Sequence, residues 1–356
     1  MEIKEKNLFT ELCKFKNRSV DLNKADLEQY TNCDMLGKLF FNRMNAIAYG
    51  VLKERNLLGQ INREFKNPLA DSYRQNKEKN ISYFKCVNML SDILFEHKNR
   101  YAMLKGALLC GLYPGGYRTA NDIDLLVRPG DITKIGDKLL KEGFIQGDTR
   151  SGKLRPADRS EIIESKMTRG ETVPYILEVN LPYMPYLEVD INFSLDYKNG
   201  DKNTLDDMLY YTASAYNGHG KIITLEKSDF FIHLCSHIYK EASTLPWIKM
   251  RRDMTLYKYC DIYMLLHDFS PEDFHELFRR ADKLGMADIC ACVIKWTCGL
   301  FKLDNPYANE FARYYLKNNE YKLHQVTVPS TNKKLVYSEK DIRERFFSKD
   351  RMKLLG

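Results

Sequence analysis

Two aspartates separated by one residue are the centre of the chemistry that this sequence can carry. In the run 121–127, Asp122 and Asp124 alternate with apolar residues. Successive side chains of a β-strand point to opposite faces, so the two carboxylates share one face and the apolar side chains share the other. Like charges held side by side raise each other's pKa unless a cation lies between them. The pair therefore predicts a divalent cation, and oxygen ligands favour Mg²⁺ or Mn²⁺.

The residues before the pair strengthen this interpretation. Asp-x-Asp alone is more typical of a turn or a solvated strand edge than of a metal site. Here an apolar segment ends at Lys105 and Gly106. A glycine at a strand-to-helix turn lets backbone N–H groups approach phosphate oxygens closely. A glycine turn, a short helix and a carboxylate pair on the next strand form one predicted construction.

A second strand with alternating polarity is predicted over 186–193. Its apolar positions alternate with Glu188, Asp190 and Asn192, so the polar side chains share a face. Asp190 is the natural third carboxylate for a metal site formed by Asp122 and Asp124. The alternative is a polar face that is merely solvated.

These motifs resemble a known family. The run Leu104–Leu109, Arg118 and Asp122–Val127 are similar to the nucleotidyltransferases with a DNA polymerase beta-like palm, and within them to the group labelled uncharacterised nucleotidyltransferases. The resemblance implies an α+β fold with a mixed palm sheet, a glycine turn at Gly106, and Asp122, Asp124 and Asp190 as metal ligands. The family usually follows the glycine with glycine or serine, whereas this chain has Ala107. Phosphate binding is therefore expected from backbone N–H groups, Lys105 and Arg118.

The function that follows from this resemblance is metal-dependent nucleotidyl transfer. We expect Asp122, Asp124 and Asp190 to be catalytic, with Mg²⁺ or Mn²⁺ as the cofactor and a nucleoside triphosphate such as ATP as the donor. The expected acceptor is a hydroxyl of a small molecule or a peptide. Two alternatives stay open: a metal-dependent transferase of another phosphate-linked group, for example a sugar, and a non-catalytic nucleotide-binding protein of toxin–antitoxin type. Clustered carboxylates without a cation would destabilise such a binding protein.

Helical patterns flank the predicted palm. Apolar side chains recur every three to four residues up to about residue 100, and Asn67–Pro68 predicts a helix stop within that stretch. From Asp201 onward the chain is predicted to be helical again, with Thr224 or Ser228 as a helix cap. The resulting division is a helical N-terminal region (1–100), the palm (101–198), a helical C-terminal domain (199–325) and a basic tail (326–356).

Two residues of the C-terminal helices are expected to contact substrate. His233 and His237 lie four apart on one helical face, a spacing found in zinc sites. The absence of a glutamate after His233 and of a nearby third ligand argues against zinc. The resembled family carries a similar helix that lines its cleft, so His237 is expected to do so. Lys258 lies on a helix that resembles a second such element, and the alternative for it is a surface pair with Asp261.

Composition limits the remaining possibilities. The 356 residues contain no apolar run near the roughly 18 residues that a membrane helix needs, and the first residues lack the apolar core of a signal peptide. We therefore expect a cytoplasmic protein without a membrane partner. The nine cysteines are scattered without zinc spacing, which favours reduced, buried thiols.

The charge pattern bears on the acceptor. The net charge is +7, and residues 331–356 carry 8 Lys and Arg against 4 Asp and Glu, which a solvated helix end explains. Acidic residues interrupt the basic ones, as in the run 251–253. A polymer-binding surface needs a continuous basic track. The sequence therefore favours a compact acceptor over a nucleic acid.

Overall fold

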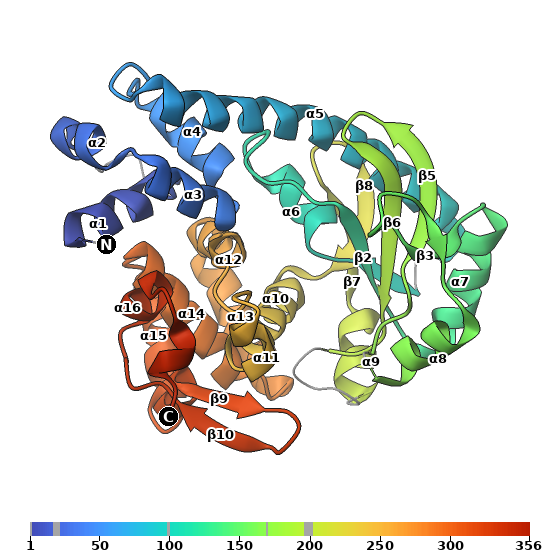
Figure 1. Cartoon of the computed structure of the whole chain (residues 1–356). Coiled ribbons are helices and arrows are strands. Elements are labelled where there is room, and N and C mark those ends of the chain that lie inside the picture. Colours follow the sequence, from blue (N-terminus) through green and yellow to red (C-terminus); the bar gives the residue numbers. More distant parts are fainter. Residues whose placement is uncertain (1, 17–21, 98–99, 169, 196–201) are drawn as a thin grey trace. The chain divides into compact units, whose positions relative to one another are not determined.

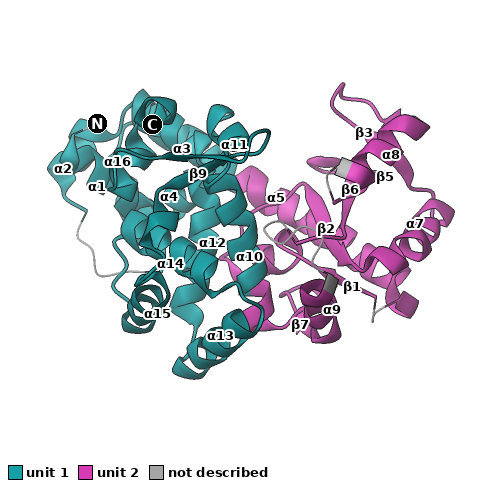
Figure 2. Ribbon diagram, turned by 90° about the horizontal axis from the view of Figure 1, so that it is seen from below, with its two compact units in different colours: residues 1–73, 231–356 teal, residues 74–230 magenta. Residues whose placement is uncertain are grey.

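The computed structural model describes residues 2–16, 22–97, 100–168, 170–195 and 202–356 (Figure 1). The chain forms two compact units, of which unit 1 comprises residues 1–73 and 231–356 and unit 2 comprises residues 74–230 (Figure 2). Helices and a mixed sheet confirm the predicted α+β class. Unit 2 includes residues 74–100 and 199–230, which the four-region division assigns to helical regions.

Unit 2 is built on a six-stranded mixed sheet. Its strand order is β1-β2-β6-β5-β3-β4, and β2 and β6 are parallel while every other neighbouring pair is antiparallel. The strands are β1 (Tyr101–Met103), β2 (Asp122–Val127), β3 (Ile145–Asp148), β4 (Arg155–Pro156), β5 (Tyr175–Leu181) and β6 (Met184–Asn192).

The predicted strand faces are confirmed. On β2, Ile123 and Leu125 are fully buried, and on β6 so are Val189 and Ile191. These side chains belong to one apolar cluster that also includes the second half of α5 (Arg63–Ile93). Because burying one aliphatic side chain contributes about 1.5–3 kcal/mol, this cluster fixes the register of both strands.

Short helices and a hairpin complete unit 2. The helices are α6 (Gly106–Leu112), α7 (Ile132–Lys141), α8 (Arg159–Thr168), α9 (Lys202–Tyr210) and the 3₁₀ turns η1 (Phe95–His97) and η2 (Pro129–Asp131). Residues predicted to be helical form the hairpin of β7 (Thr212–Tyr216) and β8 (Lys221–Leu225). Thr224 does not cap a helix, since it lies in β8 and donates to the Met103 carbonyl at 2.6 Å.

The predicted helix stop at Asn67–Pro68 is wrong. Helix α5 runs without a break from Arg63 to Ile93, with Pro68 near its start. Asn62 caps the helix by accepting a hydrogen bond from the Phe65 N–H at 2.7 Å. Pro68 is the sixth residue of α5, beyond the first four whose N–H groups lack an intrahelical partner, so it removes one hydrogen bond and the helix continues through it.

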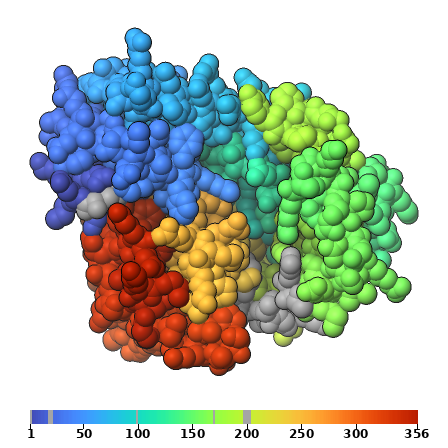
Figure 3. Space-filling model, in the orientation of Figure 1, coloured from blue at the N-terminus to red at the C-terminus, as the bar shows by residue number. Residues whose placement is uncertain are grey.

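Unit 1 is mostly helical and joins both ends of the chain. Lys6 pairs with Glu344 at 2.6 Å, and the Phe9 and Phe347 rings lie 5.6 Å apart. In Figure 3 the N-terminal residues (blue) and the C-terminal residues (red) accordingly lie next to each other. The elements are α1 (Ile3–Leu12), α2 (Lys24–Tyr30), α3 (Cys33–Phe41), α4 (Asn45–Glu54), α10 (Lys227–Ala242), α11 (Leu245–Lys249), α12 (Leu256–Asp268), α13 (Pro271–Lys283), α14 (Ala287–Phe301), α15 (Pro306–Leu316), η3 (Glu320–Leu323), β9 (Gln325–Val328), β10 (Lys333–Val336), α16 (Ile342–Phe347) and η4 (Arg351–Leu354).

The basic tail is folded rather than a solvated helix end. Its residues form the β9–β10 hairpin, α16 and η4. Arg345 is 3% exposed, and Arg351 forms an ion pair with the buried Asp253. The sequence-based expectation fails for Arg345 and Arg351, whose charged side chains have partners inside unit 1.

All nine cysteines are free thiols, and all except Cys33 are buried. This agrees with the predicted reduced state. Within the described ranges, the chain has no helix with the length and apolar character needed to cross a membrane.

Candidate functional site

The turn between β1 and α6 is tightly packed. Lys105 adopts a φ of +43°, which is uncommon for a residue with a side chain. Gly106 follows as the first residue of α6, and a Cβ at this position would lie 2.5 Å from the Ala120 Cβ and 2.8 Å from the Tyr83 hydroxyl. The predicted glycine turn is present, and close packing is a reason for glycine there.

Replacing Gly106 by alanine should therefore destabilise unit 2. The added methyl group meets the Ala120 side chain and the Tyr83 hydroxyl, and overpacking of this kind costs about 1–3 kcal/mol. Urea unfolding measures the loss. Gly115→Ala is the matched control, because a Cβ there meets nothing within 4 Å. Equal stability of the two variants would contradict the packing explanation.

Helix α5 holds the segment that leads into β2. Asn80 donates to the Arg118 carbonyl at 3.0 Å, and the Tyr83 hydroxyl donates to the Asp122 carbonyl at 3.0 Å. Asn76 likewise donates to the Gly116 carbonyl at 3.0 Å. The start of β2 is thus fixed from outside the sheet. Sequence reasoning missed these anchors, although their spacing along one face of α5 is a usable signal.

The three predicted aspartates lie on adjacent parallel strands. In the β2–β6 register Asp124 is opposite Asp190, and Asp122 is opposite Glu188. Neighbouring strands are about 4.8 Å apart, and side chains of paired residues point to the same face. The structure therefore brings Asp122, Asp124 and Asp190 to one face of the sheet, as the sequence pattern predicts.

Electrostatics distinguish the carboxylates. Burial raises the pKa of Asp122, and the Asp124 carboxylate raises it further, against the lowering effect of Lys105. The pKa of Asp190 is raised well above its usual range by burial and then by Asp124 and Asp122. Burial, followed by Asp122, raises the pKa of Glu188. These groups are poorly compensated as anions, so the site attracts a proton or a cation.

Asp124 already has a cation. The Lys105 ammonium lies 2.7 Å from the Asp124 Oδ1, and the Asn192 amide lies 3.5 Å from the same atom. The Asp124 side chain is largely buried, while Lys105 is partly exposed. Sequence reasoning assigned Lys105 to phosphate and missed this pair, because the two residues are far apart in the chain.

The donor atoms suit a divalent metal, but the side chains are not assembled around one. Carboxylate and amide oxygens are the ligands that Mg²⁺ and Mn²⁺ prefer. In the part of the chain that the structure describes, no group of three or more His, Cys, Asp and Glu is arranged to hold a metal ion. Lys105 and a bound metal would therefore compete for the Asp124 carboxylate, of which Lys105 contacts Oδ1.

Arg118 lies near the carboxylates. It lowers the pKa of Asp122, and its guanidinium donates to the Thr119 carbonyl. The predicted site residues of unit 2 thus belong to one neighbourhood. Besides Gly106, they are Lys105, Arg118, Asp122, Asp124 and Asp190.

His237 and Lys258 lie together in unit 1. Both contact Glu241, His237 through its Nε2 at 3.3 Å and Lys258 through its ammonium. Burial raises the pKa of Glu241, but His237 and Lys258 lower it overall. Sequence reasoning missed Glu241, although its position four residues after His237 is a signal. The alternative of a surface pair between Lys258 and Asp261 does not hold, because Asp261 is buried.

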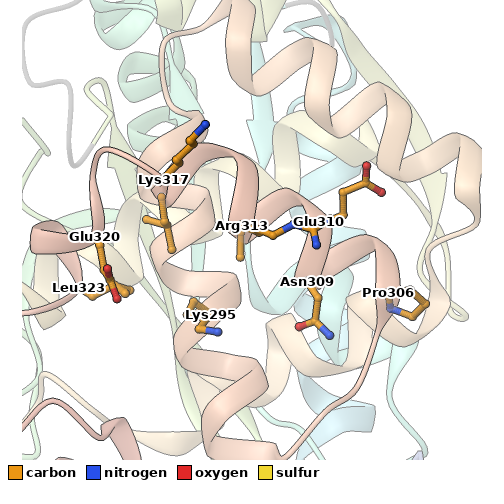
Figure 4. A pocket seen from close by; sticks show the side chains of 10 residues that line it. Lys295, Pro306, Asn309, Glu310, Arg313, Lys317, Glu320 and Leu323 are labelled. Atoms are coloured by element: carbon orange, nitrogen blue, oxygen red, sulfur yellow. The ribbon is translucent and has the colours of Figure 1, made fainter.

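A pocket of about 820 Å³ lies elsewhere in unit 1, between α14, α15 and η3 (Figure 4). Lys295, Arg313 and Lys317 line it together with apolar and acidic side chains. None of the predicted site residues lines this pocket. Its size alone therefore does not connect it with the carboxylates.

Comparison with known proteins assigns the chain to a family. The chain has no match among curated proteins. A family model described as "Uncharacterised nucleotidyltransferase" matches residues 39–301, which is well over half of the chain and includes every predicted site residue. The family description supports nucleotidyl transfer in general terms. With the carboxylate face and the glycine turn inside the matched range, the chain belongs to the family of uncharacterised nucleotidyltransferases.

Proposed function

We propose that this protein transfers a nucleoside monophosphate from a nucleoside triphosphate to a hydroxyl group, using Asp122, Asp124 and Asp190 to hold Mg²⁺ or Mn²⁺. The β2–β6 register is the observation that carries the proposal, because it sets Asp124 opposite Asp190 with Asp122 on the same face. The raised pKa values of Asp122 and Asp190 support it, since a site that disfavours bare anions gains most from a cation. The family assignment supports nucleotidyl transfer in general terms.

Each residue has a role that its chemistry suits. The bound divalent ion would supply electrostatic stabilisation of the phosphates and lower the pKa of the attacking hydroxyl. Asp190, whose pKa is raised, suits a general base that accepts the hydroxyl proton. Lys105 and Arg118 are proposed to bind phosphate oxygens, and Lys105 becomes available for this when it leaves Asp124. The polymerase beta-like character of the sheet is part of the same proposal.

The proposed acceptor is a hydroxyl of a small molecule or a peptide. Unit 2 carries 22 Lys and Arg against 22 Asp and Glu, so it has no net positive charge to hold a polyanion beside the aspartates. His237 and Lys258 are proposed to contact substrate from unit 1, with Glu241 holding both side chains in place.

The ion pair between Lys105 and Asp124 favours one alternative. A lysine that neutralises an aspartate reduces the repulsion among the carboxylates without any metal. This arrangement suits a protein that binds a nucleotide but does not transfer it. The two functions differ in an observable way, because only the transferase releases pyrophosphate.

Nucleoside triphosphate should stabilise the protein in a metal-dependent way. Ligand at a hundredfold excess over its dissociation constant stabilises the native state by about 2.7 kcal/mol. We expect a rise in the apparent unfolding temperature with triphosphate plus Mg²⁺ or Mn²⁺, and a much smaller one with triphosphate plus EDTA. Asp122→Asn serves as the control and should lose the metal-dependent part. If none of the four triphosphates gives a metal-dependent shift, the proposed donor is wrong.

A further inference from the structure

The net charge of the protein lies in unit 1. Unit 2 is balanced, with 22 cationic and 22 acidic residues, so the +7 of the whole chain comes from unit 1. An uneven distribution of this kind creates a local positive potential that diffuse charge does not. The excess positive charge is not spread evenly over unit 1.

Most of the excess lies on one small folded part, here named the basic module and defined as segments 245–253, 325–336 and 349–356. These segments contain 8 Lys and Arg against 2 Asp, a difference of +6. They include α11, the β9–β10 hairpin and η4, which share an apolar cluster containing Ile248, Val326 and Leu354. Backbone bridging of Thr244 to Thr327 also ties α11 to β9, which lies beside it in Figure 1.

Of the two acidic residues of the basic module, Asp253 does not interrupt the positive surface, whereas Asp350 is exposed. Asp253 is 2% exposed and accepts two hydrogen bonds of 2.7 Å from Arg351. Asp350 caps η4 by accepting from the Met352 N–H at 3.1 Å. The sequence argument that Asp253 breaks the basic run 251–253 is therefore wrong, because its carboxylate is turned inward and already paired.

The cations that remain are exposed. Lys249, Arg252, Lys349 and Lys353 are exposed and have no ion-pair partner among the described residues. The Arg251 guanidinium donates to the Lys349 carbonyl, which joins the end of α11 to the residues before η4. Lys333 and Lys334 of the β9–β10 hairpin are exposed as well, so three separate segments present cations on one scaffold with its own apolar core.

We propose that the basic module binds a single-stranded nucleic acid through its phosphate backbone, an interaction that goes beyond the proposed transfer reaction. Several exposed cations on segments that share one apolar cluster match the repeated charge of a phosphodiester chain. Trp247 on α11 is half-buried, and the Lys258 ammonium lies 6.0 Å from its ring centroid. A partly exposed aromatic ring beside cations can stack with an unpaired base.

Two other partners fit the basic module less well. Lysine is depleted in protein–protein interfaces, whose buried centres are apolar, whereas lysines predominate among the free cations here. A membrane surface also attracts cations, but stable attachment adds inserted apolar side chains. The basic module has two exposed large apolar side chains, Met250 and Val336, which is few for insertion into a membrane. These observations favour a nucleic acid.

The test is binding of a fluorescent 20-nucleotide single-stranded RNA to the full chain at several salt concentrations. For single strands, a plot of log affinity against log salt has a negative slope, and this slope becomes shallower by about 0.7 for each phosphate contact removed. The triple variant Lys249→Gln, Arg252→Gln, Lys349→Gln should therefore weaken binding and reduce the slope by about 2. Its control is Lys295→Gln, Arg313→Gln, Lys317→Gln, which removes the same charge from the pocket on α14 and α15 and should bind like wild type.

The outcomes separate this proposal from its alternatives. Equal weakening by both triple variants would mean that net charge alone matters, and it would overturn the assignment to the basic module. No binding of single-stranded RNA or DNA, or binding only to vesicles that contain phosphatidylserine, would overturn it as well. Asp122→Asn should bind RNA like wild type, so failure of the transfer reaction and failure of this proposal are observed independently.

Discussion

Asn in place of Asp122 or Asp124 should abolish nucleotidyl transfer while leaving the fold intact. Each substitution keeps the shape of the side chain but removes the negative charge that a divalent cation requires. We expect turnover to fall by several orders of magnitude, measured as pyrophosphate release from a triphosphate in the presence of Mg²⁺. Asp190→Asn should have a similar effect, because its carboxylate lies opposite Asp124 in the β2–β6 register.

Asp122→Asn and Asp190→Asn should not weaken the metal-free protein. Burial and neighbouring carboxylates raise the pKa of Asp122 and Asp190 in the folded chain. A raised pKa means that ionisation opposes folding, so this part of the stability is lost as the pH rises above the ordinary carboxyl range. At neutral pH, Asn at either position should leave the metal-free protein as stable as wild type or slightly more stable.

Glu188→Gln is the matched control for the three aspartates. Glu188 lies on the same polar face, opposite Asp122, and also has a raised pKa. It has no proposed contact with the metal, so its variant should keep turnover within a few-fold of wild type. Near wild-type turnover of Asp122→Asn, or equal loss in Glu188→Gln, would contradict the assignment of specific ligands.

The carboxylate face could be predicted from the sequence because strand periodicity is a strong local signal. Ile123 and Leu125 on β2 and Val189 and Ile191 on β6 must face the core, which fixes where the polar side chains between them point. That argument requires no knowledge of distant parts of the chain. The parallel pairing that sets Asp124 opposite Asp190 was not derivable in the same way, since it depends on how the strands are ordered.

Other features of the site depend on contacts between distant residues. The pair of Lys105 with Asp124, and the anchoring of the Asp122 backbone by Tyr83, join segments that no local pattern relates. The β7–β8 hairpin was missed for a different reason. Residues 212–216 read Thr-Ala-Ser-Ala-Tyr, with Tyr216 as the only large side chain, so their strand conformation comes from pairing with β8.

Charge is the property that the sequence represents least well. A one-dimensional reading gives Asp253 the same weight as its exposed neighbours Arg251 and Arg252. In the fold, Asp253 is buried and forms an ion pair with Arg351, which lies almost a hundred residues later in the chain. The composition therefore gives the net charge of the chain, but it does not show where on the folded protein that charge is located.

The pair of Asp253 with Arg351 should make a large contribution to the stability of unit 1. The contact is bidentate, with both N–O distances at 2.7 Å, and the Asp253 side chain is fully buried. Asp253→Asn leaves the largely buried Arg351 guanidinium without its counter-ion. Breaking a buried ion pair from one side costs about 3–5 kcal/mol. We expect a loss of that size in the free energy of unfolding, measured by urea denaturation.

The double variant Asp253→Asn, Arg351→Met separates the charge effect from a loss of packing. With no buried charge left unpaired, it should recover a large part of the stability lost in Asp253→Asn, because replacing both members of a buried pair is often nearly neutral. Lys24→Met, which removes one member of an exposed pair with Glu28, should change stability little. A double variant as unstable as the sum of its two single variants would show that the pair stabilises unit 1 through packing and hydrogen-bond geometry, not through compensation of charge.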